Sequence, residues 1–253
     1  MSVARLFRNP IALVLLLPLS AFADAPGFDR PGFAFASSTL PAGSWDMEQG
    51  LPDLQRDASS GMHTTLYSAD TTFRLGLTQT LEIQLAGSAF NRLDVRTAGA
   101  TTHSDGAGDT GIAMKWAPAL ADRQLSLAIL GGVTLDSGAG AFTNGRPVYA
   151  LGATLGRDLG GGKSLSLYAN LNRSGAANTW TLAPSFNFAV NEQIGAFVEA
   201  GRVAGGGNSS TLVGGGLTWL LRERVQLDLY ERRGVTSHSP DEQAGFGISI
   251  YWN

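Results

Sequence analysis

Apolar and polar residues alternate with a period of two through almost the whole chain beyond residue 43. In the last stretch, for example, Phe246, Ile248, Ile250 and Trp252 are separated by glycine, serine or tyrosine. This period is typical of β-strands that have one apolar and one polar face. Beyond the N-terminal region, no stretch approaches the roughly 18 uninterrupted apolar residues of a membrane-spanning helix. The chain is therefore expected to be all-β.

The alternation divides into twelve segments, each bounded by glycine, proline or polar residues. Most are longer than the usual strand of about 5–6 residues and suit the roughly 9–11 residues of a tilted membrane strand. The twelve segments are Ser44–Leu51, Thr64–Leu77, Thr80–Leu93, Gly108–Ala117, Leu125–Leu135, Val148–Leu159, Leu165–Asn172, Thr179–Val190, Gln193–Val203, Ser210–Leu221, Val225–Arg232 and Ala244–Trp252.

The connections between these segments alternate in length, and those after every second segment are short. Outer-membrane barrels show this pattern, with short periplasmic turns and longer outer loops, whereas a β-sandwich has no reason to sort its loops by length. We therefore predict a transmembrane antiparallel β-barrel of about 12 strands over residues 44–253, after an irregular lead over residues 24–43. The predicted long outer loops are Pro52–His63, Asp94–Ala107, Asp136–Pro147 and Arg233–Gln243.

The first 23 residues have the pattern of a secretory signal peptide. Arg5 and Arg8 precede an apolar run over Ile11–Leu19, and Ala21 and Ala23 frame a small-residue cleavage site. The run is too short to span a membrane, for which about 20 residues are needed. We predict cleavage after Ala23 and export to the bacterial outer membrane. The alternative is a retained N-terminal anchor.

Tryptophan positions suggest which face of the strands contacts lipid. All five tryptophans lie on the apolar face and near predicted strand ends. Because an indole ring is amphipathic, it settles at the boundary between lipid and water. The alternative is that the rings close the ends of a soluble core. The predicted membrane-interface girdle consists of Trp45, Trp116, Trp180, Trp219 and Trp252.

The opposite face of the strands carries the charged and amide side chains. An arginine or lysine facing mid-bilayer would cost about 2–4 kcal/mol, so these side chains are expected to line the lumen. They could form a constriction that selects solutes, or an ion-pair network that fills the lumen. Arg74 is expected to pair across the sheet, because Asp70 lies about 13 Å along the same strand. The candidates are Asp70, Arg74, Glu82, Gln84, Lys115, Arg157, Glu199, Gln226 and Asp228.

Composition excludes several functions. The chain has no cysteine, which excludes thiolate metal sites and cysteine nucleophiles, and its net charge of −3 does not suit a nucleic-acid binder. The glycine clusters at 160–162, 205–207 and 214–216 lack the residues of a phosphate-binding loop, and 104–109 lacks the ligand spacing of a calcium site. No metal and no cofactor are expected.

The histidines do not form a convincing catalytic group. His63, His103 and His238 all lie in predicted outer loops. Ser104 and Ser239 follow two of them directly, but adjacent residues of a strand point to opposite faces. A lipid-acting hydrolase with an activated serine is therefore only an alternative, and no catalytic residue is assigned.

Several short motifs occur together in the first part of the chain: Phe28–Gly32, Ser38–Gly43, Glu48–Asp53, Thr65–Asp70, Phe73–Thr78, Asn91–Leu93, Gly108–Asp109 and Asn144–Pro147. Together they resemble the outer-membrane transporter family labelled for the meta-pathway of phenol degradation. The resemblance is clearest over residues 28–155 and implies an outer-membrane channel for aromatic catabolites. The chain departs from such barrels at its C-terminus, since the aromatic residue that assembly machinery reads is here followed by Asn253.

The expected function is diffusion of small hydrophobic or aromatic solutes through the barrel, without enzymatic activity. The expected partners are outer-membrane lipid, a small-molecule solute and the barrel assembly machinery, and no nucleic acid. One alternative is a closed structural or adhesive barrel whose outer loops bind a ligand, and another is a soluble lipocalin-like protein. The sequence leaves open whether residues 24–43 fill the lumen or extend into the periplasm.

Overall fold

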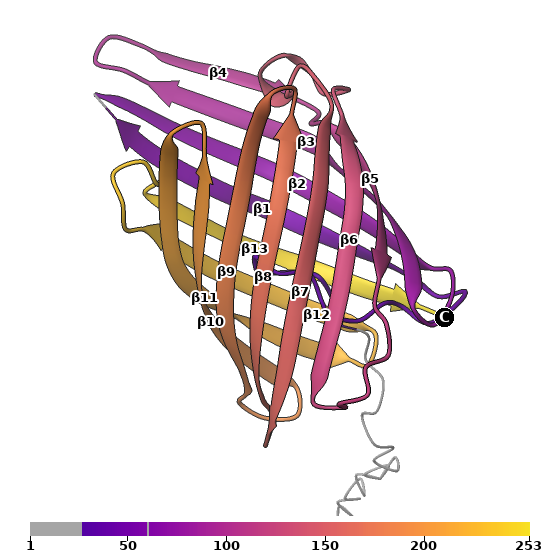
Figure 1. Ribbon diagram of the computed structural model, residues 1–253. Coiled ribbons are helices and arrows are strands. Elements are labelled where there is room, and N and C mark those ends of the chain that lie inside the picture. Colours follow the sequence, from indigo (N-terminus) through magenta and orange to yellow (C-terminus); the bar gives the residue numbers. More distant parts are fainter. Residues whose placement is uncertain (1–26, 60) are drawn as a thin grey trace, which may run out of the picture.

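The computed structural model describes residues 27–59 and 61–253, and the predicted signal peptide lies outside them. The chain forms one antiparallel sheet in which consecutive strands pair, except that β4 and β5 both pair with β3. β1 also pairs with β13, so that the sheet closes on itself (Figure 1). The strands are β1 (Trp45–Ser59), β2 (Met62–Gly76), β3 (Leu81–Arg96), β4 (Thr101–Gly106), β5 (Thr110–Trp116), β6 (Leu125–Leu135), β7 (Val148–Gly160), β8 (Lys163–Ser174), β9 (Ala177–Ala189), β10 (Ile194–Gly205), β11 (Asn208–Arg222), β12 (Val225–Gly234) and β13 (Glu242–Trp252).

Two of these strands share one position in the wall. The first part of β3, residues 81–86, pairs with β5, and its last part, residues 91–96, pairs with β4. The result is a closed 12-strand antiparallel barrel, which confirms the predicted fold. The described residues contain a single short helix, η1 (Gly140–Phe142), and no helix among them is long and apolar enough to cross a membrane.

All twelve predicted segments coincide with strands, but two of the four predicted long loops are wrong. Residues 52–59 and 62–63 belong to β1 and β2, and residues 94–96 and 101–106 belong to β3 and β4. These hairpins project well past the neighbouring strands in Figure 1. Beyond the membrane, both faces of a strand meet water, so the apolar–polar alternation that marked the strands fades there. The predicted loop Asp136–Pro147 contains no strand, and the predicted loop Arg233–Gln243 contains strand residues only at its two ends.

The barrel has an inverted core, with polar side chains buried inside and apolar side chains exposed outside. Arg74, Lys115 and Glu82 are each at most 1% exposed, whereas large apolar residues on the outer face are roughly half exposed. Four of the five tryptophans belong to that exposed face, and the fifth, Trp252, stacks on Trp45 with ring centroids 4.0 Å apart. This distribution suits a wall between lipid and a polar lumen.

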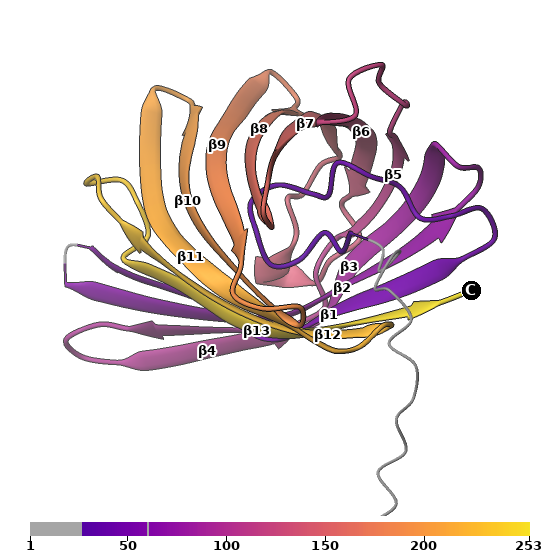
Figure 2. The same ribbon diagram turned by 90° about the horizontal axis from the view of Figure 1, so that it is seen from below.

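Residues 27–43, the described part of the predicted lead, lie inside the barrel. Figure 2 shows this segment looping across the lumen, and we call it the plug. Leu40 is fully buried, and the plug joins the wall where the Gly43 N–H donates to the carbonyl of Gly76 at 2.8 Å. The question left open by the sequence is thus answered: residues 27–43 fill part of the lumen. The turns 77–80, 117–124, 161–162, 190–193 and 223–224 lie at one end, the short-turn rim, and the extended hairpins at the other, the long-hairpin rim.

Candidate functional site

Asp29 anchors the plug to the wall formed by β3 and β5. Its carboxylate accepts hydrogen bonds from Lys115 Nζ, Gln84 Nε2 and the Ala36 N–H, each at 2.8 Å. Desolvation raises the pKa of Asp29, but the charges of Arg74 and Lys115, together with the hydrogen bonds from Lys115 and Ala36, lower it by more, so its pKa lies below the ordinary value. Asp29 therefore stays ionised at neutral pH, and the anchor is lost only in acid, as the pH falls through the lowered pKa.

Arg74 lies at the centre of the charged cluster behind this anchor. Its guanidinium donates to Asp46 at 3.0 Å, to Glu48 at 2.9 Å and to Glu82 at 2.9 Å, and Lys115 reaches Glu82 at 3.0 Å. All five side chains are buried. The prediction that Arg74 pairs across the sheet rather than with Asp70 is confirmed. Removing one member of such a buried cluster leaves the opposite charges uncompensated and destabilises the fold.

Arg30 forms the second anchor of the plug. Its guanidinium binds both carboxylate oxygens of Asp53, at 2.8 and 3.0 Å, and reaches Asp228 at 3.2 Å. Planar, two-pronged contacts of this type are specific to arginine. Gly247 on β13 allows this approach because it has no side chain, whereas a Cβ atom there would collide with the guanidinium of Arg30. This anchor ties the plug to β1 and β12 at once.

The third anchor joins the plug to β10 and β12. Glu199 accepts the Phe33 N–H at 3.0 Å and Arg232 Nε at 2.7 Å, and Arg232 donates to the Pro31 carbonyl at 2.9 Å. The Arg232 guanidinium also lies 4.1 Å from the centroid of the Phe33 ring. The ring packs directly on Gly201, where any side chain would displace it. The three anchors together tie the plug to β1, β3, β5, β10 and β12.

Most predicted lumen residues do face the lumen, but they hold the plug rather than line an open path. Arg74, Glu82, Gln84, Lys115, Glu199 and Asp228 are buried in the anchors or the cluster behind them. Asp70 lies apart, beyond the Arg74 cluster toward the long-hairpin rim. Its carboxylate accepts a hydrogen bond from the Ser68 hydroxyl at 3.1 Å.

The assignment of Arg157 to the lumen face is wrong. Arg157 is exposed and shares a strand face with the lipid-facing Leu155 and Leu159, opposite the buried Thr154 and Gly156. It lies near the end of β7 at the short-turn rim. A long cationic side chain at such a position can extend to the lipid–water boundary, so the outward orientation is inexpensive there.

Several residues of the anchors were missed from the sequence. The charged pair of the plug, Asp29 and Arg30, lies in a segment without periodicity, and only its place in the Phe28–Gly32 motif marked it. Asp46 and Glu48 do alternate with Trp45 and Met47 on β1, and that period could have identified them. Among the described residues, no group of three or more histidine or acidic side chains is placed to hold a metal ion.

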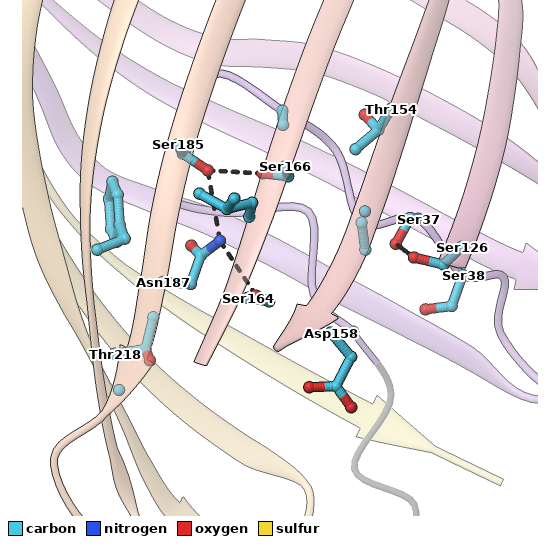
Figure 3. Close-up of a pocket in the computed structure, with 18 of the residues that line it drawn as sticks. Ser37, Ser38, Ser126, Thr154, Asp158, Ser164, Ser166, Ser185, Asn187 and Thr218 are labelled. Atoms are coloured by element: carbon cyan, nitrogen blue, oxygen red, sulfur yellow. Dashed lines mark hydrogen bonds between the residues drawn. The ribbon is translucent and has the colours of Figure 1, made fainter. Parts of the chain in front are cut away.

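A cavity of about 600 Å³ lies between the plug and the parts of β6 to β11 that are nearest the short-turn rim. Figure 3 shows the hydroxyl and amide side chains that face it. Ser37 of the plug is hydrogen-bonded to Ser126 on β6, with 2.7 Å between the two Oγ atoms. Ser166 and Ser185 are joined in the same way at 2.6 Å across β8 and β9. The cavity volume of about 600 Å³ is within the range of about 300–1,000 Å³ that is usual for small-molecule sites.

A second cavity, of about 440 Å³, lies toward the long-hairpin rim between the wall and residues 141–144. Asp109 fastens this loop, because its carboxylate accepts the N–H of Gly138 at 2.8 Å and the N–H of Asn144 at 2.7 Å. Desolvation raises the pKa of Asp109, but these hydrogen bonds, with those from the side chains of Thr143 and Asn144, lower it by more. The net shift is downward, so the carboxylate holds the loop except in acid.

Replacing Asp109 with alanine should therefore loosen the loop without unfolding the barrel. We expect faster amide hydrogen exchange at Gly138 and Asn144, because both lose their acceptor, and an unchanged midpoint of denaturant unfolding. The exposed Asp105 provides the control, and Asp105→Ala should leave both amides as they are. Unchanged exchange in Asp109→Ala would show that other contacts hold the loop.

The family model described as "Putative MetA-pathway of phenol degradation" matches residues 28–252, which includes the plug and every strand. The chain belongs to this family. The match covers the motifs that carried the resemblance and extends it across the second half of the barrel. No curated protein matches the chain.

Solved structures with the same fold are outer-membrane barrels. The COG4313 outer membrane channel from Pseudomonas putida F1 has a TM-score of 0.69 at 15% identity, over 88% of this chain and 99% of that one. The KdgM porin in complex with oligogalacturonate has a TM-score of 0.55 at 8% identity, over 83% and 99%. The beta domain of the Bordetella autotransporter BrkA also has 0.55, at 12% identity, over 84% and 100%. At these identities, the likeness is one of fold.

Proposed function

We propose that the protein is an outer-membrane channel through which small hydrophobic or aromatic solutes diffuse, and that the plug controls its opening. The observation that carries the proposal is the divided lumen. The plug is anchored to β1, β3, β5, β10 and β12, and a cavity of about 600 Å³ remains between it and the parts of β6 to β11 nearest the short-turn rim. A lumen that served only as a structural core would be filled by side chains on all sides.

The family supports the solute class in this proposal. Its description refers to phenol degradation, a process that begins with a small aromatic compound. The structure with the highest TM-score given above is described as an outer membrane channel. Phe35 and Phe197 border the cavity and offer contact surface for an aromatic ring.

Export and membrane assembly belong to the same proposal. Cleavage after Ala23 would leave a chain whose plug begins within a few residues of its new N-terminus. The exposed tryptophans on the outer face would then meet the lipid boundary, and the final strand, β13, would be presented to the barrel assembly machinery. Outer-membrane lipid and the diffusing solute are the other proposed partners.

Solute entry into liposomes that contain the refolded mature protein tests the function. Arabinose and phenyl glucoside, two uncharged solutes that cross lipid slowly, should enter faster than into protein-free liposomes, and a slower migration of unboiled samples in detergent gels should show folding. A folded barrel that admits neither solute, even when the plug is released, would leave the closed structural barrel as the better account.

A further inference from the structure

The two sides of the lumen differ in charge. The charged inward-facing side chains of the anchors come from β1, β2, β3, β5, β10 and β12, and they are buried in ion pairs. The inward face of β6 to β9 is instead formed mainly by small and uncharged side chains, and its one tyrosine, Tyr168, packs on Phe35 of the plug. Around the cavity, its unpaired charges are confined to the short-turn rim, as with Asp158. The uncharged side chains that line the cavity include Ser126, Thr154, Ser164, Ser166, Ser185 and Asn187.

Two buried polar atoms at the cavity have no hydrogen-bond partner within the described residues. They are Oγ1 of Thr154, a residue that is 3% exposed, and Nε2 of Gln226. Both residues line the cavity between the plug and the wall. Buried polar groups are nearly always hydrogen-bonded, so a hydroxyl and an amide at the edge of this cavity have unused hydrogen-bonding capacity.

We infer that the solute path follows the uncharged wall of β6 to β9 and selects uncharged solutes that carry a hydroxyl or amide group. This inference rests on the proposed channel function and assigns the residues that determine its selectivity. Beyond rim residues such as Arg123 and Asp158, an ion entering here would leave water without meeting a free counter-charge, and that transfer is costly. A hydroxyl or amide would exchange its hydrogen bonds to water for bonds to serine, threonine and asparagine side chains.

The charged wall does not offer an equivalent path. The charges of the Arg74 cluster, of Asp53 and Asp228 with Arg30, and of Glu199 with Arg232 are already paired with one another. A solute moving there would have to compete with these ion pairs for the same side chains. The selectivity residues are therefore not the charged lumen candidates that the sequence suggested.

The absence of cysteine in the chain allows a direct test, because Ser166→Cys introduces the only thiol. The thiol is modified with an anionic sulfonatoethyl methanethiosulfonate or with its small neutral methyl analogue. Two quantities are then measured in the full mature chain: the reversal potential in a potassium chloride gradient, and the relative entry of arabinose and gluconate into liposomes. Leu167→Cys, the next residue on β8 and lipid-facing, is the matched control.

Before modification, arabinose should enter several times faster than gluconate. The anionic adduct on the Ser166→Cys variant should slow arabinose entry severalfold and move the reversal potential toward the equilibrium potential of potassium. The neutral adduct should change both quantities much less. Thr154→Val, which removes the unpartnered hydroxyl but keeps the shape, should also slow arabinose. Modification of the Leu167→Cys variant should change neither quantity.

The inference is overturned if gluconate enters as fast as arabinose. It is also overturned if the thiol of the Ser166→Cys variant fails to react, or if its anionic adduct forms and changes neither measurement while the unmodified protein still passes arabinose. In these cases the channel function stands and only the path is wrong. If no solute enters through the folded protein, even with the plug released, the channel function fails and the inference fails with it.

Discussion

Replacing Asp29 and Arg30 together with alanine is expected to open the channel and to raise solute flux by about tenfold or more. The double variant removes two anchors of the plug and leaves Lys115, Asp53 and Asp228 without their plug partners. Breaking a buried ion pair costs about 3–5 kcal/mol, and each 1.4 kcal/mol changes a population by about tenfold. Rehydration of the freed charges offsets part of this cost, so we expect the lower end of the range.

Arabinose entry into liposomes and single-channel conductance both measure this effect. The barrel itself should remain folded, because the substituted residues lie outside all strands. Arg56→Ala is the matched control: it removes an exposed arginine paired with Glu242 on the outer face and should leave flux unchanged. Equal flux in the double variant and the wild type would mean that these anchors do not keep the lumen closed.

Replacing Arg74 with methionine is expected to destabilise the barrel more than any other single substitution named here. The variant leaves Asp46, Glu48 and Glu82 buried, with Lys115 as the only neighbouring cation. Removing one partner of a buried charged group costs about 3–5 kcal/mol, because the remaining charges stay uncompensated. The midpoint of urea unfolding in detergent, followed by the shift between folded and unfolded bands on gels, measures the loss.

A rescue variant separates the charge effect from the loss of packing. Adding Asp46→Asn and Glu48→Gln to Arg74→Met removes the uncompensated charges and should recover much of the lost stability. The exposed Arg233, 61% exposed and paired with Glu231, is the control, and Arg233→Ala should cost less than about 1 kcal/mol. An unfolding midpoint of Arg74→Met equal to that of the wild type would contradict the central role of this cluster.

The strands were predictable from the sequence because lipid imposes a strict period on them. Each outward position requires an apolar residue, such as Phe246 or Trp116, and a charged residue such as Lys115 requires an inward position. The ends of β1 to β4 escaped prediction, because beyond the membrane neither face is constrained in that way. Arg157 was misplaced for a related reason, since near the rim a charge on the outer face costs little.

The plug was not predictable as a plug, because it has no regular backbone pairing and so leaves no period in the sequence. Its contacts are specific ion pairs between residues far apart in the chain, such as Arg30 with Asp228. The sequence showed the polar inward residues but could not show that most of them face residues 27–43. It therefore suggested a charged selectivity lining where the structure has a binding surface for the plug.

A reversible disulfide between the plug and the wall tests the central claim most directly. Ser37 and Ser126 touch through their hydroxyl groups, and the chain has no other thiol, so Ser37→Cys with Ser126→Cys would form one defined crosslink. Arabinose flux through the crosslinked protein should be abolished and should return to the wild-type rate after reduction. Equal flux before and after reduction, with the crosslink verified by mass, would show that solute passage does not require the plug to move.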